Sequence, residues 1–341
     1  MGLYFKNTSY KERALEDARI EVARRNTVTT DDISSRHTVI DAFFLLIKDE
    51  SEENLSNLCE LMRKYYMQDG IELTVEECYR LTQGDDIPGK IMLSKEMKND
   101  IYHIAWGCLK DNIPLGSKTI MNGTINTSDW IGHCMWEGRL AGRFAEAMRL
   151  DVHKAIRYGL LHDYGRKFSH GADHITKGYE ALSDIGWNEE GIGCLTHSFL
   201  NGGRCSWNDL PVDGFFVDEA GRAHFEEGCE KDDITIFLEN YQYSEYDDIL
   251  NIADLMATSR GIVSPAERIE DIATRRKFDP RNRGYFLAEF TNHLVKMADN
   301  MGWKVPEELQ QKVYAARGIT LEEITARFQK VSEFFYSEFS V

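Results

Sequence analysis

The chain has 341 residues, of which 42% are hydrophobic, enough for one large domain or two ordinary ones. Its formal net charge of −17 argues against nucleic acid as the main partner, because an acidic surface is repelled by the phosphate backbone. The seven cysteines include no CxxC pair, so we expect reduced thiols. No apolar run approaches about 18 residues and no signal-peptide pattern begins the chain, so we expect a cytoplasmic protein without a membrane segment.

The first third of the chain is predicted to be helical. Apolar periodicity predicts helices over residues 10–26, 37–48, 53–67 and 94–109. Thr74 and Glu77 form a capping-box pattern that begins a further helix, which continues through Leu81. The small and polar segment 116–128 (GSKTIMNGTINTS) is typical of a linker. We therefore expect a first domain over residues 1–122, with a role that the sequence does not define.

The rest of the chain is also predicted to be helical, which gives an all-α fold class. Helices are expected over residues 127–150, 152–162, 232–241, 246–260, 265–276, 286–301 and 321–339. A short hairpin is expected between Phe215 and Phe225, and a turn-rich break over residues 278–285. These segments predict a central domain over residues 123–276 and a C-terminal helical extension over residues 277–341.

The stretch Tyr158-Gly-Leu-Leu-His-Asp-Tyr-Gly-Arg166 places a histidine and an aspartate where an apolar helix ends. Buried ionisable groups are costly unless they are paired or bound to metal. Similar polar residues interrupt other apolar segments of the chain, at His133, His197 and Asp254, and His174 begins the helix that follows the pair. Because imidazole and carboxylate together suit borderline divalent metals, the pattern predicts a site for manganese, iron, cobalt, nickel or zinc.

This order of residues resembles the HD-domain superfamily of metal-dependent phosphohydrolases. GLLHDYGRK, which contains His162 and Asp163, is similar to the family's LLHDIGK segment, and His174-Ile-Thr-Lys-Gly178 resembles its HxxxG. His197 matches the additional histidine of members with two ions. The segment after Asp254 (LMATSRGIVSPAERIEDIATRR) is similar to the tail of some small bacterial members. The resemblance covers residues 127–276 and implies an HD-domain helical bundle with additional N- and C-terminal helices.

The resemblance also implies a ligand set and a reaction. Two divalent transition-metal ions would activate a water that attacks a phosphomonoester, a nucleotide or a phosphoanhydride. Asp163 would bridge the ions and take part in catalysis, while Arg166 and Lys167 would hold phosphate oxygens. The implied metal ligands are His133, His162, Asp163, His174, His197 and Asp254.

Two residues depart from the family pattern. Tyr164 stands in place of an aliphatic residue, and Arg166 replaces the usual lysine, which keeps the charge but changes a point charge into a planar fork. No GYP tripeptide follows His197, which argues against a cyclic-di-GMP phosphodiesterase. Diiron oxygenases of the same superfamily share the ligand order, so activation of dioxygen is an alternative reaction. A nucleotide-sensing module without turnover is a further alternative.

Other charged residues near these positions are weaker candidates. Glu137 lies one turn after His133 and is expected either to orient a ligand or to face solvent. Lys177, Arg260 and Arg268 could approach a phosphate group. The expected partner is a small phosphorylated substrate, with nucleotides among the candidates. The aromatic C-terminal helix is expected to pack or to form a subunit contact, which leaves a homo-oligomer open.

Overall fold

A computed structural model of the chain is built almost entirely from helices, which confirms the all-α fold class. The only sheets among the described residues are two short antiparallel hairpins. The structure describes residues 3–24, 42, 51–66, 68–82, 84–94, 129–200, 215–217, 223–225, 232–259, 261–275, 280–314 and 319–340. The expected helices over 37–48 and 94–109, and the linker over 116–128, lie outside the described residues, apart from residues 42 and 94.

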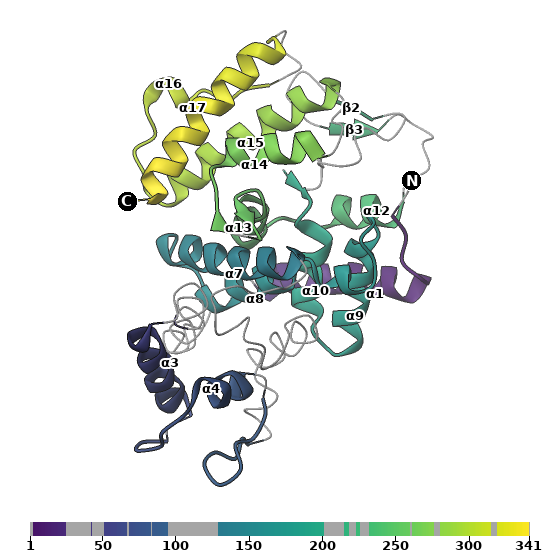
Figure 1. Cartoon of the computed structure of the whole chain (residues 1–341). Coiled ribbons are helices and arrows are strands. Elements are labelled where there is room, and N and C mark those ends of the chain that lie inside the picture. Colours follow the sequence, from purple (N-terminus) through teal and green to yellow (C-terminus); the bar gives the residue numbers. More distant parts are fainter. Residues whose placement is uncertain are drawn as a thin grey trace.

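Five helices form the centre of the molecule (Figure 1). Helices α7 and α8 pack against each other, as do α9 and α10, and α13 contacts α7, α8 and α10. A single 3-10 turn, η1, connects the end of α8 to the segment before α9 and packs against α9. The bounds are α7 (Asp129–Ala147), α8 (Val152–Leu161), η1 (Tyr164–Lys167), α9 (His174–Asp184), α10 (Asn188–Thr196) and α13 (Glu245–Asp254).

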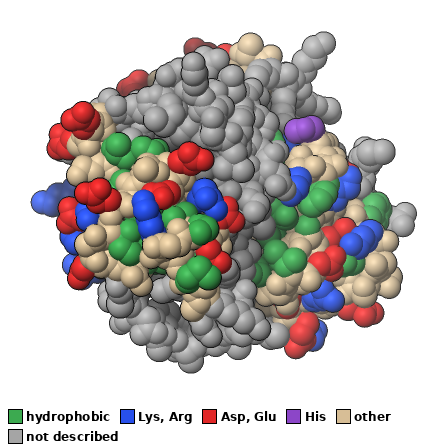
Figure 2. Space-filling model, turned by 60° about the horizontal axis from the view of Figure 1, so that its bottom comes forward, with side chains coloured by type: hydrophobic (Ala, Val, Ile, Leu, Met, Phe, Trp, Pro, Cys, Tyr) green, Lys and Arg blue, Asp and Glu red, His purple; other side chains and the backbone are tan. Residues whose placement is uncertain are grey.

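The N-terminal helices cover two sides of this centre. Helix α1 (Thr8–Arg24) contacts α10 and α12 (Asp233–Asn240), and the Tyr179 hydroxyl donates to the buried carboxylate of Asp17 at 2.6 Å. Helices α3 (Glu52–Tyr65) and α4 (Val75–Thr82) lie at one end of the molecule, and their apolar residues share a core cluster with side chains of α7 and α8. Figure 2 shows acidic, basic and hydrophobic side chains intermingled over the described part of the face at that end.

The C-terminal helices form the opposite end of the molecule in Figure 1. Helices α15 and α17 pack against each other, and α14 contacts α17. Their apolar side chains join α7, α8 and α13 in a second core cluster. The bounds are α14 (Pro265–Arg275), α15 (Pro280–Asn300), α16 (Glu307–Gln310) and α17 (Leu321–Ser340). No described helix combines the length and the apolar character that crossing a membrane requires.

Local sequence signals place several helix ends correctly. Thr74 and Glu77 form the expected reciprocal cap, because the Thr74 N–H donates to Glu77 Oε2 at 2.8 Å and the Glu77 N–H donates to Thr74 Oγ1 at 3.2 Å. Thr320 and Glu323 form the same arrangement before α17. The expected hairpin is also present, since β2 (Phe215–Val217) pairs with β3 (Ala223–Phe225) in antiparallel register.

Two expected helix boundaries are wrong. The helix expected to continue to residue 260 ends at Asp254, and β4 (Ala257–Thr258) and β5 (Gly261–Ile262) form a tight hairpin instead. Gly261 has a φ of +153°, a backbone conformation open mainly to glycine, so the chain can reverse there. A turn-rich break was expected over 278–285, but α15 already begins at Pro280, so this expectation is wrong from residue 280 onward. Proline is tolerated there because it occupies the first turn of the helix.

Two glycines allow α7 and α8 to approach closely. A Cβ atom added at Gly159 of α8 would lie 2.6 Å from the Cα atom of Gly138 of α7, closer than non-bonded carbon atoms can approach. This contact is between backbones, so no side-chain rotation can relieve it. The position of His162, three residues after Gly159, therefore depends on a helix contact that only glycine permits.

We predict that Gly159→Ala destabilises the protein by about 1–3 kcal/mol, the usual cost of overpacking, because one helix backbone must move. Gly284→Ala is the matched control. A Cβ atom at Gly284, in α15, would meet the side chains of Leu321 at 3.6 Å and Ile324 at 3.8 Å, both ordinary contacts, and alanine favours the helix. Urea unfolding of both variants measures the difference. Equal midpoints would show that the α7–α8 contact is not restrictive.

Candidate metal centre

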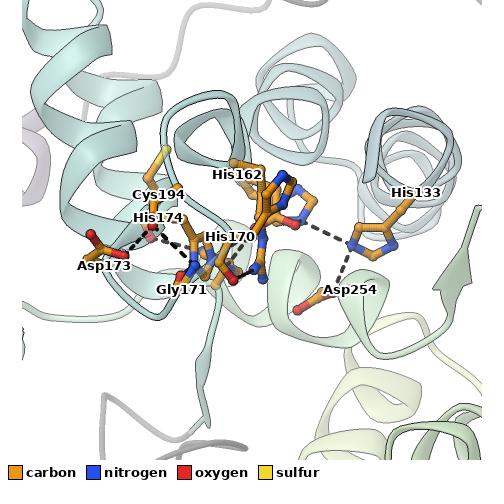
Figure 3. Close-up of polar contacts among 12 residues, drawn as sticks. His133, His162, His170, Gly171, Asp173, His174, Cys194 and Asp254 are labelled. Atoms are coloured by element: carbon orange, nitrogen blue, oxygen red, sulfur yellow. Dashed lines mark hydrogen bonds and ion pairs between the residues drawn. The ribbon is translucent and has the colours of Figure 1, made fainter. Parts of the chain in front are cut away.

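The ends of the central helices bring seven ligand-type side chains together inside the protein (Figure 3). Two come from α7, two follow the end of α8, one begins α9, one follows α10, and one ends α13. Six of them are buried, and the seventh, Asp254, is partly buried. In chain order they are His133, Glu137, His162, Asp163, His174, His197 and Asp254. All six residues that the sequence pattern selected as ligands thus lie in one cluster.

The cluster contains two overlapping groups that could hold metal ions. Ligand atoms of the first group, from His133, Glu137, His162 and Asp254, all lie within 4.8 Å of one another. Ligand atoms of the second group, from His162, Asp163 and His197, satisfy the same criterion.

His174 adjoins the second group. Its Nε2 atom lies 2.9 Å from Asp163 Oδ1 and 3.3 Å from His197 Nε2. The two groups share His162 and meet at Asp163, which is the arrangement expected for two neighbouring ions.

All four histidines are oriented by a hydrogen bond from Nδ1 to a backbone carbonyl oxygen. His162 donates to Gly159, His174 to Gly171 and His197 to Cys194, each three residues earlier, at 2.7, 2.7 and 2.9 Å. His133 donates to the distant Ala257 at 3.1 Å. A carbonyl oxygen can only accept, so Nδ1 carries the proton in each ring and the neutral ring has a bare Nε2.

The bare Nε2 atoms face one another across the cluster. The Nε2 atoms of His133 and His162 are 3.2 Å apart, and Figure 3 shows both rings directed toward the same space. Burial lowers the pKa of His162 to about 4 and that of His197 to about 3, so both rings are neutral near pH 7. Lone pairs that converge in this way repel each other unless a cation lies between them. The donor set therefore fits a divalent metal ion.

Asp163 is placed to bridge the two groups. Its Oδ1 atom lies 2.9 Å from His174 Nε2 and 3.6 Å from His197 Nε2, while its Oδ2 atom lies 3.7 Å from His162 Nε2. Burial raises the pKa of Asp163, but His162, His174 and Arg166 outweigh burial and hold this pKa well below its usual value. The carboxylate is therefore ionised, with Oδ1 toward His174 and His197 and Oδ2 toward His162, which the two groups share.

Asp254 supplies the second carboxylate that the sequence predicted. Its Oδ1 atom lies 3.0 Å from His133 Nε2, and Figure 3 shows the contact. Burial raises the pKa of Asp254, and the nearby histidines lower it more strongly, so this group is also ionised. The end of α13 at this residue, which the sequence did not predict, leaves Asp254 at a helix terminus next to the β4–β5 hairpin.

Glu137 belongs to the same cluster, although the sequence left it between orienting a ligand and facing solvent. The solvent-facing alternative is wrong, because Glu137 is 0% exposed. Its Oε2 atom lies 3.0 Å from His162 Nε2 and 3.4 Å from His133 Nε2. The i, i+4 spacing from His133 was the available signal, since residues so spaced share one helix face.

The arginine and lysine side chains that the sequence suggested for phosphate binding have different surroundings. The Arg166 Nε–H donates to Asp163 Oδ1 at 3.1 Å and its Nη1 donates to the carbonyl of His170, so two of its donors face the protein. Lys167 is exposed and lies 5.9 Å from the ring centre of Tyr164. Lys177 pairs with Asp173 at 2.6 Å. Arg268 pairs with Asp271, and Arg260 lies outside the described residues.

Gly165 determines how closely η1 can approach α9. A Cβ atom at this position would lie 1.8 Å from the carbonyl oxygen of His174 and 2.7 Å from the backbone nitrogen of Gly178. The absence of a side chain lets the His162–Asp163 pair approach His174, so Asp163 Oδ1 can reach His174 Nε2. The arrangement of ligands from α8 and α9 thus depends on a backbone contact.

We predict a specific pH dependence for the stability of metal-free protein. His197 has a pKa of about 3 when folded and about 6.5 when unfolded, so acid protonates the unfolded state first and destabilises the fold. When the pH falls from 7 to 5, the free energy of unfolding of the wild type should therefore drop on the order of 2 kcal/mol further than that of His197→Gln. Urea unfolding in chelator measures this change. The exposed His170→Gln is the control, and an equal change there would contradict the assignment.

Comparison of the chain with protein-family models, with curated proteins and with solved structures found no match. The helical fold and the buried cluster of histidine, aspartate and glutamate side chains are compatible with an HD-like site. The resemblance to the HD superfamily therefore rests on the order of these residues in the sequence and on their arrangement in the fold.

Proposed function

We propose that the chain is a divalent-metal-dependent phosphohydrolase with a centre for two ions, acting on a phosphomonoester, a nucleotide or a phosphoanhydride. The observation that carries this proposal is the pair of ligand groups that share His162 and meet at Asp163. The order of the ligands along the chain, which resembles that of HD phosphohydrolases, supports it further.

Ions bound here would lower the pKa of a water ligand and neutralise negative charge on a phosphoryl group. The protein would provide the rigid frame for that chemistry. The backbone carbonyls of Gly159, Gly171 and Cys194 fix three imidazole rings, and Arg166 orients the carboxylate of Asp163. Outer partners of this kind tune the affinity and the reactivity of a metal site.

We assign binding of the substrate's phosphate group to a basic side chain at the edge of the cluster. Lys167 follows Arg166 directly and its side chain is exposed, so it can reach a phosphate oxygen of a substrate. Arg166 keeps a structural task, because it already donates to Asp163 and to the carbonyl of His170. The two neighbouring residues would thus have different roles: Arg166 would position Asp163, and Lys167 would bind phosphate.

The reaction is tested by release of inorganic phosphate. Metal-free protein restored with manganese, iron, cobalt, nickel or zinc should release phosphate from members of a nucleotide and phosphomonoester panel without dioxygen. Asp163→Asn should reduce both metal affinity and turnover by more than the roughly 10–100-fold that loss of an outer partner brings. Dioxygen consumption without phosphate release would instead support the oxygenase alternative, and binding of nucleotides without turnover would support a sensing module.

The division between Arg166 and Lys167 gives a matched pair of variants. Arg166→Ala should weaken metal binding by roughly 10–100-fold, because Asp163 loses the donor that orients it. Lys167→Ala should bind metal as the wild type does but lose about 10- to 150-fold in kcat/KM, the equivalent of one charged hydrogen bond. Titration of metal-free protein with Mn²⁺, followed by steady-state kinetics, measures both effects. Unchanged metal affinity in Arg166→Ala would show that Arg166 does not support Asp163.

A further inference from the structure

Glu137 is a buried side chain to which no residue in the described part of the chain donates a hydrogen bond. It is 0% exposed, and neither Oε1 nor Oε2 accepts a hydrogen bond. Its two close polar contacts are to His133 Nε2 at 3.4 Å and to His162 Nε2 at 3.0 Å. Both rings use Nδ1 as a donor to a backbone carbonyl, so Nε2 is the atom that each ring turns toward the carboxylate.

No fixed positive charge offsets this carboxylate. Among the described residues, no lysine or arginine forms an ion pair with Glu137, and the arginine that affects it electrostatically, Arg268, pairs with Asp271 instead. A second carboxylate, Asp254, faces the same two imidazoles, with Oδ1 at 3.0 Å from His133 Nε2. Burying a charge without a partner is strongly unfavourable, so this arrangement requires a compensating group.

Two groups could compensate the carboxylate, a proton or a metal ion. A proton on Glu137 would supply one donor and would relieve one of its two contacts with imidazole nitrogen. It would not relieve the contact between His133 Nε2 and His162 Nε2, which are 3.2 Å apart. A divalent ion in this space would be attracted by all four side chains, because their ligand atoms lie within 4.8 Å of one another. The geometry therefore favours the ion.

We propose that Glu137 is itself a metal ligand, binding the same ion as His133, His162 and Asp254. This adds a carboxylate to the six ligands that the sequence pattern implies. The inference rests on the proposed metal centre, but it does not depend on which reaction the centre performs.

A ligand role for Glu137 makes the two ion positions chemically different. The position on the α7 side has two carboxylates, Glu137 and Asp254, beside its imidazoles. The other position has one carboxylate, Asp163, beside imidazoles that include His174 and His197. Carboxylate oxygens suit manganese, whereas imidazole nitrogens suit zinc, iron and nickel. The position formed by Glu137 should therefore bind Mn²⁺ more readily than a site with a single carboxylate would.

The test uses Glu137→Gln in the full-length protein. Glutamine has the shape and the neutrality of a protonated glutamate but lacks the negative charge of an ionised one, so it separates the two explanations. Metal-free wild type and variant are titrated calorimetrically with Mn²⁺, and bound metal is counted by elemental analysis. We expect the variant to lose one of two Mn²⁺ ions, or to bind it weaker by more than the roughly 10–100-fold typical of an outer partner. The metal-free variant should be at least as stable as the wild type in urea, because glutamine keeps the shape of the side chain and places no negative charge in the buried site.

Glu190→Gln is the matched control. Glu190 is also a buried glutamate, 3% exposed, but it pairs with Arg157 at 3.0 Å between α8 and α10. Its replacement breaks an ion pair and leaves Arg157 without that partner, so this variant should lose stability and keep wild-type Mn²⁺ binding. Each measurement is thus expected to separate the two variants, since Mn²⁺ binding falls only in Glu137→Gln and stability falls only in Glu190→Gln.

Wild-type Mn²⁺ affinity and stoichiometry in Glu137→Gln would overturn the proposal, since a protonated carboxyl would then explain the site. If the glutamine variant is insoluble, Glu137→Asp replaces it. A ligand shortened by one methylene should bind Mn²⁺ more weakly, whereas unchanged binding would again overturn the ligand role. A wild type that binds no divalent ion would refute the metal centre and this inference together. Two bound ions without phosphate release would refute only the hydrolase.

Discussion

The tautomer of four buried histidines is the constraint on which the rest of the site depends. Each ring donates Nδ1–H to a backbone carbonyl and thereby directs a bare Nε2 toward the other ligands. Two of these carbonyls, from Gly159 and Cys194, belong to the last turns of α8 and α10, where the final helix carbonyls have no partner within the helix. The free carbonyl groups at the ends of α8 and α10 thus orient the histidines that directly follow these helices, His162 and His197.

The order of the ligands could be predicted from the sequence, because most of them are polar residues in apolar segments and His174 matches the HxxxG of the family that the chain resembles. His162 is followed by Asp163 at the end of an apolar helix, and a buried pair of this kind needs a partner. The helical fold class could also be predicted, because apolar residues recur at the helical period along most of the chain. The distances between ligands could not be predicted from the sequence. The spacing of His174 and His197 along the chain does not show that their Nε2 atoms lie 3.3 Å apart.

The features missed from the sequence share a physical cause, since each depends on what packs against a residue. Glu137 has ordinary helical spacing, and only the surrounding core distinguishes a buried glutamate from a solvated one. Gly138 and Gly159 count against a helix by propensity alone, yet their lack of side chains allows α7 and α8 to touch. The hydrogen bond from Arg166 to Asp163 Oδ1 at 3.1 Å likewise could not be predicted from the spacing, and the expected phosphate contact of Arg166 stays a prediction.

The contact made by Gly165 has a consequence for how relatives of this chain could be recognised. Any side chain there would collide with the carbonyl oxygen of His174, at 1.8 Å for Cβ, so the segment after the His162–Asp163 pair could no longer lie against α9. A homologue could exchange one ligand for another of similar chemistry and still bind an ion. It could not lose this glycine without rebuilding the backbone around the site. In an alignment, Gly165 should therefore vary less than several of the ligands themselves, and it would mark descent where the ligand set has diverged.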